Sequence, residues 1–181
     1  MNNQIPIKKE LEEIEKNYDP QLSFRKLGVR LEVLVSLLLV LMSVYHFWAS
    51  GFGLVREVLH RGIHISFVLA LVFFLFGWNK KEDLDKTNEG YFYFQNISIL
   101  DYIFAFLAVG SALYLPLLPS KELASIVGNP RSVDVFIGSV LIILTLEAAR
   151  RSVGSTLPII AIIFTLFALF GPLAPGALKH G

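Results

Sequence analysis

Long blocks of hydrophobic residues alternate with short polar segments along the chain. A helix needs about 20 apolar residues to cross the ~30 Å hydrocarbon core of a bilayer, so blocks of this length predict transmembrane helices. The blocks cover about 31–49, 55–78, 100–118, 134–151 and 157–173. We therefore predict an all-α integral membrane protein with about five transmembrane helices, in which Asp101 is a plausible N-cap of the third helix.

The last two blocks form the most informative stretch, because the polar hinge between them carries a compact set of charges. Glu147 lies near the end of the fourth block, and Arg150 and Arg151 follow it three and four residues later. On a helix these spacings place the three side chains on neighbouring surface positions. We interpret them as a structural charge cluster in which Glu147 pairs with Arg150 or Arg151. The alternative is part of an ion path, since a charge within a span is a functional candidate.

A second polar group surrounds the turn between the first two blocks. Its members are His46, Arg56, His60, Arg61 and His64. Three of them, at positions 56, 60 and 64, recur every four residues and share one helix face, while His46 ends the preceding block. We predict an interfacial polar face that makes hydrogen bonds between the first two helices. The alternative is a haem or metal site formed by the three histidines.

Composition narrows the class of function further. The 181 residues are 54% hydrophobic with mean hydropathy +0.60, and the formal net charge of +1 predicts no nucleic-acid partner. There is no cysteine, which excludes disulfides and thiolate metal sites. No nucleophile–base–acid set, glycine-rich phosphate loop or paired intramembrane carboxylate is visible. We therefore expect neither an enzyme nor a bound cofactor or metal.

The distribution of positive charge predicts the orientation. With the N-terminus inside, eleven of the 16 Lys and Arg residues fall in segments on the cytoplasmic side, so we predict N-terminus in and C-terminus out. Residues 1–27 form a cytoplasmic lead that is either a short surface helix at 8–16 or a frayed tail. The first thirty residues show no cleavable signal peptide.

Several segments together resemble a known family. They read YHFWASGFGL, LHRGIHISFVLALVF, DYIFAFLAVGSALY, and LEAARR followed by LPIIAIIF and FGP. About residues 28–178 are similar to the N-terminal part of the fused membrane permease of TAXI-type TRAP (tripartite ATP-independent periplasmic) transporters. The resemblance implies a four-helix scaffold at 28–152, resembling the small subunit of such permeases, and a connecting helix with a truncated tail at 153–181.

The same resemblance implies a division of labour in a bacterial-type inner membrane. The scaffold would brace a large transport subunit or domain that carries the substrate and sodium sites, and a periplasmic solute-binding protein would deliver the solute. The large part has no counterpart in these residues, so we expect no transport by this chain alone. Two other classes remain open: a haem- or redox-type membrane anchor subunit, and a free-standing small helical membrane protein.

Overall fold

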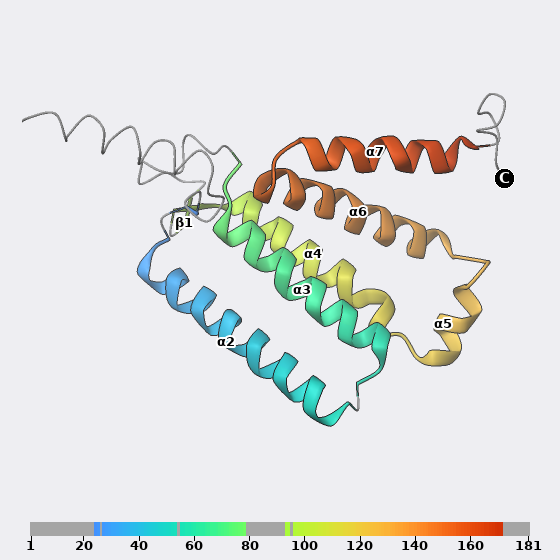
Figure 1. The fold of residues 1–181 in the computed structure, drawn as a ribbon, viewed down its shortest axis with the longest axis horizontal. Helices are drawn as coiled ribbons and strands as arrows, with labels where there is room; N and C mark the ends of the chain where they lie inside the picture. The colour runs from blue at the N-terminus through green and yellow to red at the C-terminus, as the bar shows by residue number, and fades with distance from the viewer. Residues whose placement is uncertain (1–23, 26, 54, 79–92, 95, 172–181) are drawn as a thin grey trace, which may run out of the picture.

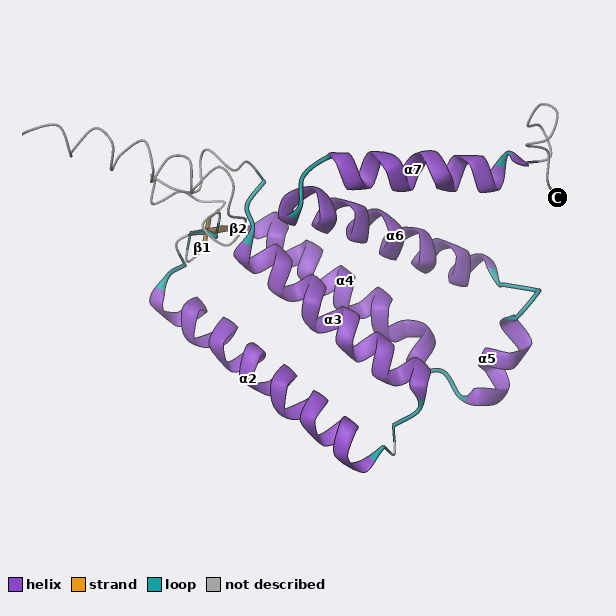
Figure 2. Cartoon of the chain, viewed as in Figure 1, coloured by secondary structure: helices purple, strands orange, loops and turns teal. Residues whose placement is uncertain are grey.

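The computed structural model describes residues 24–25, 27–53, 55–78, 93–94 and 96–171 (Figure 1). The surface helix considered at 8–16 and the tail after 171 lie outside these residues. The described part contains six helices and a two-stranded antiparallel hairpin, β1 (Tyr93–Phe94) and β2 (Ile97–Ser98) (Figure 2). The predicted all-α, multi-span fold class is confirmed.

Four of the helices are long and apolar enough to cross a membrane. They are α2 (Val29–Phe52), α3 (Glu57–Leu75), α4 (Ile99–Leu117) and α6 (Ser132–Ser152). At 1.5 Å per residue, their 19 to 24 residues span about 29 to 36 Å. Consecutive long helices run in opposite directions and lie side by side, as expected for spans joined by short connections (Figure 1).

Two shorter helices complete the described chain. The predicted fifth span is α7 (Thr156–Leu169), which contacts α6 and diverges from it away from the hinge that joins them (Figure 1). Its 14 residues reach only about 21 Å, so the described part of this helix is shorter than a full span. The loop expected at 119–133 contains a further helix, α5 (Ser120–Ile126), which sequence periodicity did not predict.

The closest helix pair is α3 with α4, and a glycine makes this approach feasible. Gly62 faces Pro116 so closely that an added Cβ would lie 2.4 Å from the proline Cγ. Further along the pair, Phe73 of α3 is fully buried, and Ala105 and Ala108 of α4 leave room for the apolar core. Small residues at such contacts allow two helices to pack backbone to backbone.

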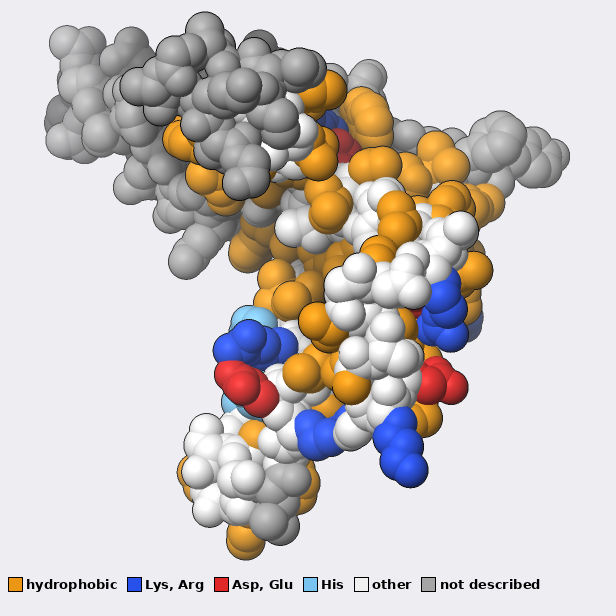
Figure 3. Space-filling view, turned by 90° about the vertical axis from the view of Figure 1, so that its right-hand side faces the viewer, with side chains coloured by type: hydrophobic (Ala, Val, Ile, Leu, Met, Phe, Trp, Pro, Cys, Tyr) orange, Lys and Arg blue, Asp and Glu red, His pale blue; other side chains and the backbone are white. Residues whose placement is uncertain are grey.

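Outside this core, the apolar side chains of the long helices face outward. In Figure 3, hydrophobic side chains spread over the middle of the visible face, and charged side chains gather towards its lower end. An outward apolar band between charged ends is what a lipid environment stabilises. The helix pattern and this surface both identify a multi-pass membrane protein.

Candidate functional site

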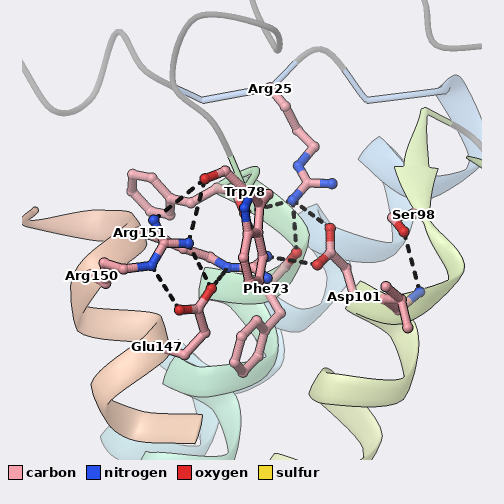
Figure 4. Close-up of polar contacts among 10 residues, drawn as sticks. Arg25, Phe73, Trp78, Ser98, Asp101, Glu147, Arg150 and Arg151 are labelled. Carbon is pink, nitrogen blue, oxygen red and sulfur yellow. Dashed lines mark hydrogen bonds and ion pairs between the residues drawn. The ribbon is translucent and has the colours of Figure 1, made fainter. Parts of the chain in front are cut away.

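The charged residues at one end of the bundle form a continuous network where α3 and α6 end and α4 begins (Figure 4). At its centre, the carboxylate of Asp101 accepts hydrogen bonds from two arginines. Arg25, which precedes α2, donates from Nη2 at 2.9 Å, and Arg151 of α6 donates from Nη1 at 2.6 Å. The three side chains are buried, and that of Arg151 has no exposed surface. One acid therefore ties together three separate segments of the chain.

Glu147 extends the network along α6. Its carboxylate accepts from Arg150 Nε and Nη2, both at 2.8 Å, and from Arg151 Nε at 2.7 Å. Arg151 thus bridges two carboxylates, Glu147 on its own helix and Asp101 on α4. Fork-shaped guanidinium groups suit such shared pairing because their donors lie in one plane.

Arg25 and Arg150 also donate to carbonyl groups at the end of α3 and just beyond it. Arg25 Nη2 donates to the carbonyl oxygens of Phe73 at 3.3 Å and Phe76 at 2.5 Å. Arg150 donates to the carbonyl oxygen of Trp78 at 3.4 Å, and its guanidinium lies 4.8 Å from the centre of the Trp78 ring. The last carbonyls of a helix lack intrahelical partners and attract cations, so these contacts stabilise the helix end.

The electrostatic balance of the network favours a structural role. It combines three guanidinium groups with two carboxylates. Among the described residues, two buried donors, Arg25 Nε and Arg151 Nη2, find no acceptor. Buried ion pairs gain little net free energy when formed, but losing one partner is costly because a buried charge is left alone. The arrangement can therefore hold helix ends in one geometry, with both carboxylates engaged by arginines.

The structure brings together Glu147, Arg150 and Arg151, the members of the predicted charge cluster. It adds Arg25 and Asp101, which the sequence did not place in this cluster. Glu147 pairs with both Arg150 and Arg151. The prediction that Asp101 caps α4 was wrong, because Ser98 is the N-cap and accepts the Leu100 N–H at 3.3 Å. One signal in the sequence did point to a distant partner: Asp101 has no basic residue three or four positions away.

The predicted polar face divides into four sets of contacts, two of which involve histidines. His46 Nε2 lies 2.9 Å from His64 Nδ1, and Tyr45 Oη lies 3.1 Å from His60 Nδ1, so both pairs join α2 to α3. Tyr45 was not among the residues predicted for this face.

The two arginines of the predicted face point elsewhere. Arg56 donates to the Pro116 carbonyl at 2.9 Å and to Ser120 Oγ at 3.3 Å, which closes the end of α4. Arg61 forms an exposed ion pair with Glu57 on its own helix.

The donor geometry argues against His46 as a metal or haem ligand. No group of three His, Cys, Asp or Glu side chains within the described ranges could hold a metal ion. Both ring nitrogens of His46 are engaged, Nδ1 with the Met42 carbonyl at 2.7 Å and Nε2 with His64. A histidine ligand needs one nitrogen free to coordinate.

A third polar cluster lies at the opposite end of the bundle, where α6 begins. Asp134 accepts from Tyr114 Oη at 2.7 Å and from the Arg131 backbone N–H at 2.8 Å. The Asp134 carboxylate also raises the pKa of the Arg131 guanidinium through their hydrogen bond. Because the Arg131 side chain is 53% exposed, this pair is an N-terminal cap open to solvent.

In comparisons with protein-family models, curated proteins and solved structures, no match to this chain is found.

Proposed function

We propose that this chain is a membrane scaffold that braces a large transport subunit or domain in a TRAP-type secondary transporter. The observation that carries the proposal is the buried ionic network, which fastens the ends of α3, α4 and α6 into one block. A part that holds a moving partner in the bilayer must itself keep one shape. Packed interiors with paired buried charges resist continuous deformation, so this block supplies that rigidity.

The described helices lack the features of a solute site. Secondary transporters bind solute near the bilayer midplane, where interrupted helices expose backbone groups. Here α2, α3 and α6 contain no proline, and Pro116 lies at the last turn of α4. The buried hydroxyls of Ser66 and Ser111 donate to carbonyls of their own helices, at Gly62 and Leu107. No polar groups converge on a ligand there, so substrate and sodium would be handled by the large subunit.

Apolar surface remains available for such a partner. Along α7, whose neighbour is α6, Ile163 and Phe164 are exposed, and Pro158 is the helix's one buried residue. On the other edge, α2 packs against α3 and buries Leu31 and Val35. In the proposed assembly, lipid and the large subunit share these surfaces, and a periplasmic solute-binding protein delivers the solute.

Recovery of the complex tests this proposal. The tagged chain is isolated in mild detergent from the membranes of cells that naturally produce it, together with any large membrane protein bound to it. We expect stoichiometric recovery, reduced by Phe164→Arg on α7. The matched control is Phe106→Arg on α4, which is also exposed on a long helix but is not part of the surface along α7. Failure of any large membrane protein to co-purify with the intact chain would refute the proposal.

A further inference from the structure

Four aromatic rings join the C-terminal half of α2 to the N-terminal half of α3. We call Tyr45, His46, His60 and His64 the four-ring cluster. The His46 and His64 rings are 4.9 Å apart and nearly perpendicular, whereas Tyr45 stacks on His60 at 5.5 Å. The His46 and His60 rings are 5.3 Å apart, so the two pairs are in contact.

The proton positions in the histidine pair follow from the Met42 carbonyl. A carbonyl oxygen only accepts, so the His46 Nδ1 that lies 2.7 Å from it carries a hydrogen. In neutral His46 the Nε2 atom then has none and must accept. The hydrogen of the 2.9 Å contact therefore resides on His64 Nδ1, and His64 Nε2 has a free lone pair.

The hydrogen bond between His46 and His64 survives the binding of one proton but not of two. The first proton adds to the free Nε2 of His64 and leaves the Nδ1–H···Nε2 hydrogen bond in place. A second proton has only His46 Nε2 left to bind. Two N–H groups, each on a cationic ring, would then face each other at 2.9 Å, with no acceptor between them. The contact between His46 and His64 must break at that step.

We propose that the His46–His64 pair is a proton-binding site that loosens the C-terminal half of α2 from α3 when it takes up its second proton. The buried residues of α2, Leu31 and Val35, lie at the other end, and Leu38 and Met42 are only partly buried against the core, so the polar contacts of the four-ring cluster contribute much of what holds this half of α2 to α3. The charged residues of α2, Arg30 and Glu32, also lie there.

The titratable and charged groups around His46 and His64 already have partners, so the pH-dependent change is assigned to this pair. On α3, Glu57 is paired with Arg61, and Arg56 is held by the end of α4. Tyr45 can donate to neutral His60 and can accept from protonated His60, since a hydroxyl does both. Protonation of His60 therefore does not by itself break the Tyr45–His60 contact, so the loosening begins at His46–His64. The chain of hydrogen bonds from His64 also ends at a backbone carbonyl, which cannot pass a proton on, so the site senses protons and does not conduct them.

The absence of cysteine allows a clean distance measurement on the full chain. Spin labels are placed at Phe47→Cys on α2 and Phe136→Cys on α6, both of which are exposed. The distance distribution is recorded in lipid nanodiscs at about pH 8 and about pH 5, on either side of the range in which histidine side chains titrate. We expect one narrow distribution at high pH and a broader, longer one at low pH.

Two variants assign the change. His64→Gln presents an amide that both donates and accepts, so it should abolish the pH-dependent change. His60→Gln should leave the change intact. An unchanged wild-type distribution, a change that persists in His64→Gln, or a change lost in His60→Gln would each overturn the proposal.

A measurement without any substitution covers the case in which a variant fails to fold. In ¹⁵N-histidine-labelled protein, the N–H···N bond gives a nitrogen–nitrogen coupling between His46 and His64. We expect this coupling to persist after the first protonation and to vanish after the second. Its absence at high pH, or its survival once both rings are cations, would contradict the proposed proton positions.

Discussion

Replacing Asp101 with alanine probes the centre of the ionic network. The change removes the acceptor of two charge-assisted bonds, 2.9 Å from Arg25 and 2.6 Å from Arg151. These arginine side chains are 4% and 0% exposed, so water cannot replace the carboxylate. Loss of one partner of a buried ion pair costs about 3–5 kcal/mol. Arg25 keeps two carbonyl partners and Arg151 keeps Glu147, which places the loss in the free energy of unfolding at about 3 kcal/mol.

A matched acid at the other end of the bundle supplies the control. The Asp134 side chain is 4% exposed, close to the 6% of Asp101. Its partner Arg131, however, is 53% exposed and can be hydrated again. Asp134→Ala should therefore cost about 1 kcal/mol, as expected for a lost helix cap. Unfolding is followed by helical circular dichroism during titration with dodecyl sulfate in mixed micelles. A loss for Asp101→Ala no larger than that for Asp134→Ala would refute the reasoning.

Three further predictions concern a helix contact, the topology and the charge cluster. Gly62→Ala should lower the free energy of unfolding by about 1–3 kcal/mol, because the new Cβ would meet Pro116. Gly110→Ala should not destabilise the protein, because the space around Gly110 is open. Thermal unfolding of both variants checks this. Reporter fusions after Gly90 and Pro130 should read inside and outside, and an inside signal at Pro130 would contradict the predicted topology. Glu147→Ala should reduce the yield of folded protein more than Glu147→Gln, which keeps an oxygen acceptor; full assembly of Glu147→Ala with abolished uptake in the reconstituted complex would instead indicate an ion path.

The long helices could be predicted from the sequence because their signal is local. Each apolar block of membrane length became a helix, and the ends of α2, α4 and α6 lie within three residues of the expected positions. The short helix α5 was missed because its seven residues carry too few apolar positions for a periodic pattern. The close approach at Gly62 was also missed, since it depends on which turn of α4 faces α3.

The site was predictable only where its partners share a helix. Glu147, Arg150 and Arg151 are three and four residues apart, so helix geometry alone brings them together. Arg25 and Asp101 are 76 residues apart, and their contact depends on how the start of α4 packs beside the segment before α2. No spacing rule contains that information.

Reconstituted uptake tests the central claim most directly. Sodium-dependent uptake of solute is measured in proteoliposomes that contain this chain alone, the large permease subunit alone, or both, each with the solute-binding protein. The scaffold account predicts uptake only when both membrane components are present. Saturable uptake by this chain alone, or full uptake by the large subunit without it, would contradict the account.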